Sequence, residues 1–378
     1  MGRGHIRGIC ILVATAVALA AAGVASAATG TVSSFGSDEF GQLGNGSGGS
    51  SLTPVAVAGL TGVTQLDGGR EHAIALKSDG TVWAWGHNNY GQVGDGTKTN
   101  RQSPVQVSGL AGVITVETGH YSSMALRNDG TVWAWGWNKF GTLGDGTTVN
   151  RSLPVRVPGL ANVVAIAGAR DHALALRSDG TVWAWGDNEF GNLGTGNTTN
   201  HLTPVQVQGL SNVVAIAGGR DHSLAVRSDG TAWAWGWNKY GQIGDGSHTN
   251  RLTPVQVTGL SGVTEVSAGA EHSMALTGSG AVWTWGHNND GQLGDNTLTS
   301  RRRPVRATGI SGVVEIGNGR LHSLAIESDG SLWTWGLNST GQLGDGTTTN
   351  RRVPVRIAAL SGAFGVGGGV NYSVVLHT

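Results

Sequence analysis

A nine-residue motif recurs along the chain at a spacing of fifty residues. It reads SDGTVWAWG at residues 78–86 and returns five more times, each copy with a pair of tryptophans in the same register. The first tryptophans of these pairs are Trp83, Trp133, Trp183, Trp233, Trp283 and Trp333. A seventh copy, TVSSFG at residues 31–36, has Ser33 and Phe35 in the tryptophan positions. Because a period of about 20–50 residues is typical of solenoids and propellers, this repeat limits the possible folds more than any other feature.

Each repeat contains four runs that are typical of short β-strands. The first three are exemplified by VVAIAG at 163–168, HALAL at 172–176 and TVWAWG at 181–186. The fourth follows each TVWAWG run, and its example is PVRV at 154–157, after the copy at 131–136. The glycine of Ser178-Asp179-Gly180 favours a tight hairpin between the second and third runs. The proline that begins the fourth run suits an outer edge strand, where a missing N–H breaks no ladder bond. Four antiparallel strands ordered from the inside outward form a propeller blade, so the sequence predicts an all-β, seven-bladed β-propeller.

The two ends of the chain predict how the ring closes. The first repeat begins with a third-strand run at 31–36, and the last one ends with first- and second-strand runs at 366–369 and 372–377. We therefore expect one closing blade shared by the N- and C-terminal strands, two from each end. Residues 28–378 would form a single propeller domain of seven fifty-residue repeats.

The first 27 residues are typical of a secretory signal peptide. Arg3 and Arg7 precede a small and apolar run at 9–24, and Ala25-Ser26-Ala27 resembles a cleavage site. The alternative interpretation is an N-terminal membrane anchor. Cleavage would remove Cys10, the only cysteine, so the mature chain would contain no disulfide. We predict a secreted protein, extracellular or associated with the cell wall, with no membrane span in the mature chain.

The charge balance argues against nucleic acid as a partner. The chain has 24 basic and 24 acidic side chains, and its only run of basic residues is 301–303. A nucleic-acid binder usually carries a basic stripe for phosphate contacts. Abundant Ala and Gly, and many arginines beside few lysines, are typical of a GC-rich bacterial source.

The paired tryptophans are best interpreted as core residues. Because side chains alternate along a strand, Trp183 and Trp185 share one face while Val182 and Ala184 share the other. Both faces are apolar, as stacked blades require. Burial of one tryptophan contributes up to ~5 kcal/mol, so such residues supply an adequate core without disulfides. Ligand stacking is the alternative role for these pairs.

The combined motifs WGxNxxGQLGDG, PVxVxGL and GxxHSLAL, at this spacing over residues 31–378, resemble the regulator of chromosome condensation repeat family, and a secreted bacterial member in particular. The resemblance implies a seven-bladed propeller. It implies function less directly, because fold does not fix function. In this family a nuclear member is a nucleotide-exchange factor for a small GTPase, a plant relative is a light sensor, and a secreted bacterial relative inhibits β-lactamases.

Most recurring polar residues are expected to belong to the framework. One histidine position recurs in five units, and it is replaced by Ser122 and Tyr372 in the other two; its members are His72, His172, His222, His272 and His322. We expect each histidine to bond backbone at the start of its blade. Asp95 with Arg101, and the equivalent pairs at fifty-residue steps, are expected to brace the long loop. We find no catalytic constellation, and we predict no cofactor and no metal site.

Positions that differ between repeats are the candidates for function. Two loops per blade share one face: the turn between the first and second strands and the long loop between the third and fourth. Three consecutive blades place a mixed group of aromatic and charged residues there: Trp137, Lys139, Arg170, Asp171, Asp187, Glu189, Arg220, Asp221, Trp237 and Lys239. Two tryptophans outside the framework beside mixed charges are typical of an interaction hot spot. The alternative is a solvated rim whose tryptophans pack on their own loops.

Departures from relatives rank the possible functions. The inhibitors carry aromatic residues where this chain has acids such as Glu71 and Glu271, and only Tyr121 keeps that pattern. The light sensor has tryptophans where this chain has Arg70 and His120. We therefore predict a non-enzymatic monomer that binds a protein or cell-wall component. The alternatives are an inhibitor of an extracellular β-lactamase or cell-wall hydrolase, a carbohydrate-binding protein or enzyme, and a guanine-nucleotide exchange factor.

Overall fold

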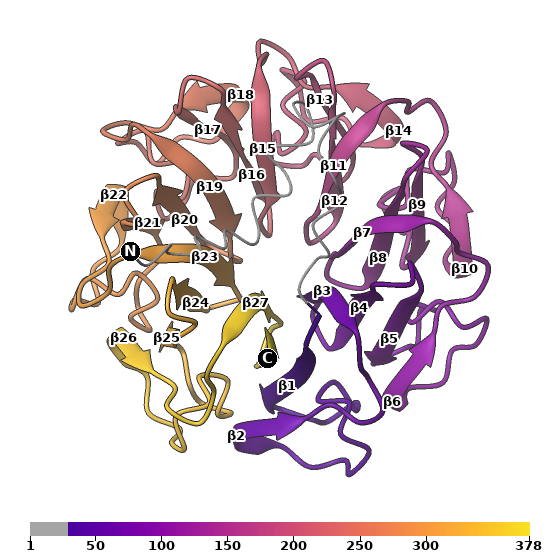
Figure 1. The fold of residues 1–378 in the computed structure, drawn as a ribbon. Helices are drawn as coiled ribbons and strands as arrows, with labels where there is room; N and C mark the ends of the chain where they lie inside the picture. The colour runs from indigo at the N-terminus through magenta and orange to yellow at the C-terminus, as the bar shows by residue number, and fades with distance from the viewer. Residues whose placement is uncertain (1–28) are drawn as a thin grey trace, which may run out of the picture.

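The computed structural model describes residues 29–378, and within this range 28 strands form seven four-stranded antiparallel sheets around a central axis (Figure 1). The prediction of a signal peptide at residues 1–27 lies outside the described residues. The predicted all-β, seven-bladed β-propeller is confirmed. No helix in the described part of the chain is long and apolar enough to cross a membrane.

The strands follow the order expected from the sequence, from the axis outward. The innermost strands are β3 (Val63–Gly68), β7 (Val113–Thr118), β11 (Val163–Gly168), β15 (Val213–Gly218), β19 (Val263–Ala268), β23 (Val313–Asn318) and β27 (Ala363–Gly368). The second strands are β4 (His72–Lys77), β8 (Ser122–Arg127), β12 (His172–Arg177), β16 (His222–Arg227), β20 (His272–Thr277), β24 (His322–Glu327) and β28 (Tyr372–His377). The third strands are β5 (Val82–Gly86), β9 (Val132–Gly136), β13 (Val182–Gly186), β17 (Ala232–Gly236), β21 (Val282–Gly286), β25 (Leu332–Gly336) and β1 (Thr31–Gly36). The outer strands are β6 (Arg101–Gln106), β10 (Arg151–Arg156), β14 (His201–Gln206), β18 (Arg251–Gln256), β22 (Arg301–Arg306), β26 (Arg351–Arg356) and β2 (Ser51–Ala56).

We number the blades 1 to 6 from β3–β6 to β23–β26, and we call the last sheet the closing blade. The closing blade has the order β2-β1-β28-β27 and joins both ends of the chain, as predicted (Figure 1). Its central pair is in continuous register from Thr31 opposite His377 to Gly36 opposite Tyr372. The ring is therefore fastened by backbone hydrogen bonds between the first and last described segments.

The outer strands differ from the prediction in where their proline lies. In blade 2 the strand starts at Arg151, so Pro154 is its fourth residue and not its first. Arg151 pairs with Gly136 and Val155 pairs with Ala134, which leaves residues 152–154 as an irregular segment between the two pairings. A proline is tolerated there because the ladder is already interrupted.

Each seam between neighbouring blades is filled by one hydrophobic cluster, and a tryptophan is its largest member in most seams. Trp85 is fully buried between the closing blade and blade 1, and its indole Nε1 donates to Gln42 O of the closing blade's loop at 2.9 Å. Trp83 packs against the same cluster but is only half-buried; its Nε1 donates to Thr81 Oγ1, and Lys77 lies over its ring. The core interpretation is confirmed fully for the second tryptophan and partly for the first. In the seam between blade 6 and the closing blade, Phe35 takes the tryptophan position.

A glycine of the WGxNxxGQLGDG motif leaves room for the buried tryptophan of the next blade. Gly94 has φ +79°, and a Cβ at this position would lie 2.6 Å from Nε1 of Trp135 in the next blade. Any side chain there would both strain the backbone and push the indole out of the seam.

The recurring histidines bond across the seams. His72 is fully buried, and its Nε2 lies 3.0 Å from Oγ of Ser123 in the next blade, while that hydroxyl donates to Gln92 O. The same pairs join His172 to Ser223, His222 to Ser273, His272 to Ser323 and His322 to Ser373. The framework role is therefore confirmed, but the expected backbone partner of the ring was wrong: Nε2 meets a side chain of the neighbouring blade. Burial lowers the pKa of His72, His172, His222 and His322 to about 3.

The two seams without a histidine also lack its serine. Ser122 stands in the histidine position of blade 2, and the following blade has Ala173 in the serine position. Tyr372 stands there in the closing blade, followed by Ala73 in blade 1, and its hydroxyl donates to His72 O. A buried histidine without this serine would leave its Nε2 without a hydrogen-bond partner, whereas the serine also donates to a backbone carbonyl.

The long loops are held internally as predicted. Arg101 Nε donates to Asp95 Oδ2 at 2.7 Å, and the equivalent ion pair occurs in blades 2, 4, 5 and 6. Asn88 is fully buried; its amide donates to Thr99 O and accepts from Val93 N. These residues therefore fix the backbone of the loop.

Candidate functional site: the long-loop face

The two predicted loops of each blade lie together on one face of the ring. The backbone N–H of Trp137 donates to Tyr121 O at 2.9 Å, and the N–H of Asp187 donates to Asp171 O at 2.8 Å. The start of each long loop is thereby fixed to the turn between the first two strands. We call this surface the long-loop face.

Charged residues of blades 3 to 5 form a chain of ion pairs on this face. Arg170 Nε lies 2.7 Å from Asp171 Oδ2, and its Nη1 lies 3.5 Å from Asp221 Oδ2 in the next blade. Arg220 Nε lies 3.1 Å from the same Asp221 oxygen, and its Nη1 donates to Glu271 Oε1 at 3.1 Å. Each arginine therefore links its own blade to the following one.

Asp171 and Asp221 of these ion pairs, and the nearby long-loop residue Asp187, are more buried than the arginines. Asp171, Asp187 and Asp221 are 3%, 8% and 4% exposed, whereas Arg170 and Arg220 keep about a third of their side chains exposed. Burial raises the pKa of Asp171 to about 6, against the opposing effect of Arg170, and it also raises the pKa of Asp187 and Asp221. Oδ1 of Asp171 has no hydrogen-bond partner. What this sector offers a partner is the outer side of the guanidinium groups together with the exposed Glu189.

Trp137 belongs to an aromatic cluster built from blades 1 and 2. Its ring centroid lies 5.6 Å from Phe140, 6.2 Å from Tyr90 and 6.4 Å from Tyr121. Tyr121 also contacts His87 at 5.5 Å, and all these contacts are tilted or edge-on. Trp137 and its aromatic neighbours Tyr90 and Phe140 are half-buried, so the cluster presents ring edges and partial faces to solvent.

Trp237 belongs to a second cluster, from blades 3 to 5. Its ring lies 5.7 Å from Phe190 and 5.6 Å from Tyr240, while the Arg220 guanidinium lies over it at 5.7 Å. Tyr240 continues the cluster to His287 at 4.5 Å. Like Trp137, Trp237 is half-buried.

The structure thus brings the predicted site residues into three adjacent groups rather than one. Among the described residues, no ring contact joins Trp137 to Trp237, and the charged chain of blades 3 and 4 lies between them. Lys139 and Lys239 are exposed, and each ammonium lies over the aromatic ring that follows it, Phe140 at 5.4 Å and Tyr240 at 5.3 Å.

Sequence reasoning missed the aromatic residues that hold these clusters together. They occupy one position of the long loop in five repeats: Phe40, Tyr90, Phe140, Phe190 and Tyr240. The same position is Asp290 and Thr340 in blades 5 and 6. This change from aromatic to polar around the ring was visible in the sequence and would have extended the predicted surface from two tryptophans to an arc.

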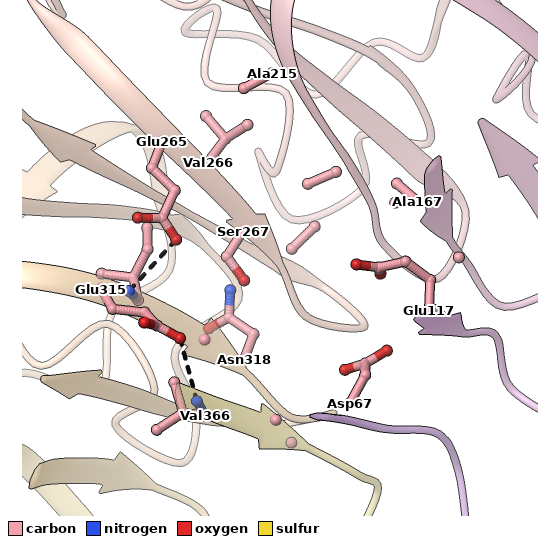
Figure 2. A pocket seen from close by; sticks show the side chains of 18 of the residues that line it. Asp67, Glu117, Ala167, Ala215, Glu265, Val266, Ser267, Glu315, Asn318 and Val366 are labelled. Carbon is pink, nitrogen blue, oxygen red and sulfur yellow. Dashed lines mark hydrogen bonds between the residues drawn. The ribbon is translucent and has the colours of Figure 1, made fainter. Parts of the chain in front are cut away.

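A cavity of about 2070 Å³ runs along the axis of the ring, lined by the innermost strands. Figure 2 shows carboxylates on two sides of it, with Asp67 and Glu117 from blades 1 and 2 and Glu265 and Glu315 from blades 5 and 6. The sequence analysis did not single out these residues.

The channel carboxylates cap the inner edge of the neighbouring blade. Asp67 Oδ2 accepts from the N–H and the hydroxyl of Thr118, at 2.8 and 2.6 Å. Glu265 Oε1 accepts from Ile316 N at 3.4 Å, and Glu315 Oε1 accepts from Val366 N at 3.2 Å (Figure 2). Burial raises the pKa of Asp67, Glu117 and Glu265. An innermost strand has a free edge, so these side chains satisfy backbone groups that no further strand reaches.

The described residues include no group of three or more His, Cys, Asp or Glu side chains that could hold a metal ion. The buried histidines bond serines in separate seams, and the channel carboxylates bond backbone. What the geometry does offer is an outward-facing surface of half-buried rings and guanidinium groups, which is suited to recognition.

Comparisons with known proteins agree with this architecture. A model of the RCC1-like domain matches residues 113–375, and models of the regulator of chromosome condensation (RCC1) repeat match residues 29–76, 79–126 and 63–92. No functionally curated protein matches the chain.

Solved structures of similar fold include yeast and human proteins. Prp20p from Saccharomyces cerevisiae, described with its binding to Gsp1p and histones, is 24% identical, with a TM-score of 0.82 over 92% of this chain and 91% of its own. Yeast RCC1 (Prp20) bound to Kap60 is 22% identical, with a TM-score of 0.85 over 100% and 94%. Human WBSCR16 is 24% identical, with a TM-score of 0.82 over 92% and 99%. At these identities the likeness establishes the fold alone.

The repeat motifs, the closing blade and the match over residues 113–375 lead to one conclusion: this chain belongs to the RCC1-like domain family of β-propellers.

Proposed function

We propose that this protein is a secreted, non-enzymatic propeller that binds a protein partner of the extracellular space or cell envelope through the long-loop face. The observation that carries the proposal is the arc of half-buried aromatic rings over the closing blade and blades 1 to 4, interrupted by the charged sector around Arg170. Tryptophan, tyrosine and arginine are the residues that dominate binding energy at protein interfaces. RCC1-like propellers are generally non-catalytic regulators or exchange factors.

The ring geometry favours a protein over a glycan. A sugar stacks on the open face of an aromatic ring, but Trp137 is contacted at 51–90° by three neighbouring rings, and Trp237 lies under Arg220. A protein surface can instead fit ring edges and reach the exposed Lys139 and Glu189. Secretion follows from the predicted signal peptide, and it sets this chain apart from an exchange factor that acts on a cytoplasmic GTPase.

The proposal is tested by capturing the partner at the face. Benzoylphenylalanine placed at Glu189, an exposed long-loop position, should cross-link the partner from culture medium or from an envelope fraction of the source organism. The same photoreactive residue at Gln206, exposed on outer strand β14, is the position control. The captured protein is then purified, and its affinity for the unmodified chain is measured.

Paired substitutions then assign the binding to the aromatic arc. Trp137→Ala with Trp237→Ala should weaken binding about 30-fold or more, the loss of one hot spot of ~2 kcal/mol. Trp133→Ala with Trp233→Ala is the matched control, because these residues are also half-buried but lie at the opposite ends of strands β9 and β17. Equal affinity of the unmodified chain and the Trp137/Trp237 variant would refute the proposal. If the captured protein is a hydrolase that stops turning over when bound, the inhibitor alternative is correct.

A further inference from the structure

Five exposed arginines lie on the outer strands of two neighbouring blades. They are Arg302, Arg303 and Arg306 on β22 and Arg352 and Arg356 on β26. The two strands lie on the outside of the ring, in neighbouring blades (Figure 1). We call these five residues the arginine edge.

The other blades show that this concentration is not a property of the repeat. The equivalent three positions in the closing blade and blades 1 to 4 carry leucine, threonine, serine, alanine or glutamine, and a single arginine, Arg156. Outer strands therefore fold without arginine at these places. Charge has been concentrated on one side of a ring whose overall formal charge is zero.

The arginine edge is not neutralised by the protein itself. Within residues 29–378 none of the five makes an ion pair, whereas Arg301 and Arg351, which begin the same strands, are paired with Asp295 and Asp345 at 2.8 and 2.6 Å. Asp295 and Asp345, the acids of the adjoining long loops, are thus already paired with other arginines. Asp329 is an acid whose electrostatics do include an arginine of the edge. Hydrogen bonds from Ser331 mainly lower its pKa, and the charge of Arg356 lowers it further.

The backbone that carries these arginines is anchored to the preceding blade. Arg302 O accepts from Gly246 N, and Arg352 O accepts from Asn296 N, both at 2.9–3.0 Å and both from the long loop of the preceding blade. An anchored segment that presents guanidinium groups binds oxyanions with less ordering cost than a free loop does.

We infer that the arginine edge is a second binding surface, for an extended polymer whose charges are phosphodiesters, such as a glycerol-phosphate polymer of a cell envelope. The guanidinium fork binds phosphate oxygens in bidentate fashion and is weakly hydrated. The five groups are spread over two strands rather than converging on one pocket, which fits charges spaced along a chain. Neither strand contains an aromatic residue, so the stacking that single-stranded nucleic acids require is missing.

The test is the salt dependence of binding to fluorescent poly(glycerol phosphate), followed by anisotropy with the purified chain. With five phosphate contacts, log K should fall with log salt at a slope of about −3.5, a loss of roughly 100-fold between about 50 and 200 mM salt. Replacing Arg302, Arg306, Arg352 and Arg356 with glutamine should reduce the slope to about −0.7.

A charge-matched control removes four exposed cations elsewhere: Lys98→Gln, Lys139→Gln, Arg156→Gln and Lys239→Gln. This control should keep most of the affinity, and the Trp137→Ala/Trp237→Ala variant should bind the polymer as the unmodified chain does. The inference is independent of the proposed function, because the two surfaces share no residue. Equal losses in the control and the arginine variant would overturn the edge as a site. Tighter binding of polyglucuronate through the same arginines would overturn a phosphodiester polymer as the occupant. Tighter binding of single-stranded DNA would overturn the glycerol-phosphate polymer in favour of a nucleic acid.

Discussion

Trp135 and Trp137 are two residues apart in the same segment, yet they belong to different regions of the molecule. Trp135 is fully buried in the seam between blades 1 and 2, with its Nε1 bonded to Gln92 O, while Trp137 is half-buried on the long-loop face among other rings. The seam residue recurs in six blades, and the face residue recurs only once, as Trp237. The same residue type thus serves the framework where the repeat preserves it and becomes a candidate for recognition where the repeat varies.

The largest expected effect concerns the seams of the closing blade. Deleting residues 363–378 removes β27 and β28, and with them both seams of the closing blade. We expect the truncated chain to lose cooperative unfolding, because the ends are no longer fastened and the clusters around Trp85 and Phe35 are opened. Denaturant titration followed by tryptophan fluorescence checks this. A truncated chain that unfolds in the same single transition as the intact one would show that closure is dispensable.

A second prediction separates seam from face by single substitutions. Trp135→Ala should lower the free energy of unfolding by about 3–5 kcal/mol, because it empties a packed seam and leaves Gln92 O without its donor. Trp137→Ala should cost about 1 kcal/mol, since its ring is already part-solvated. Urea unfolding of the two variants, in parallel, measures both values. Similar losses at the two sites would mean that the face tryptophan is also framework.

A third prediction concerns the histidine–serine pairs, and its effect appears as pH dependence. Burial lowers the pKa of His322 to about 3, whereas an unfolded histidine titrates near 6.5. Between these values the unfolded chain binds more protons, so the contribution of His322 is complete above pH ~6.5 and is lost as the pH falls toward ~3. His322→Ser with Ser373→Ala copies the Ser122/Ala173 seam. It should make the stability–pH profile shallower by up to about 1.4 kcal/mol per pH unit in this window.

The reverse substitution tests whether adding such a pair has the opposite effect. Ser122→His with Ala173→Ser should add a pair where the chain lacks one and steepen the acid loss of stability by a similar amount. The free energies of unfolding of both variants and the unmodified chain are compared from pH ~4 to ~7. Parallel profiles for all three proteins would contradict the assignment of acid sensitivity to the seams.

Much of the architecture could be predicted because it is local or repeated. Short apolar runs bounded by glycine define the strands, and the incomplete motif at 31–36 located the closing blade. The Asp95–Arg101 brace was predictable for the same reason, since its two residues are six apart in one loop. The position of Pro154 was not, because a bulge arises from pairing with the neighbouring strand.

The candidate site could be predicted only in outline. The sequence identified the positions that vary, but it predicted Asp171, Asp221 and Arg170 alike as partner-binding residues. In the structure both acids are buried and paired with Arg170, which is itself partly exposed. It placed Trp137 and Trp237 on either side of the charged residues, but it did not show that each tryptophan joins an aromatic cluster of its own. Burial and ring contacts on this face are set by side chains of neighbouring blades, about fifty residues apart, and a pattern read within one repeat contains no information on them.

The ring, its seven blades and the framework residues follow from the amino-acid sequence, because fifty-residue repetition copies one local arrangement around an axis. Only the tertiary structure decided which partner each framework residue meets and which variable residues reach solvent. His72 bonds Ser123, and Tyr90 packs near Trp137, because adjacent blades bring one repeat's residues against the next. A single blade cannot bury its apolar faces alone, so the hydrophobic clusters of the seams form only between adjacent blades. The aromatic clusters of the long-loop face likewise join residues of adjacent blades.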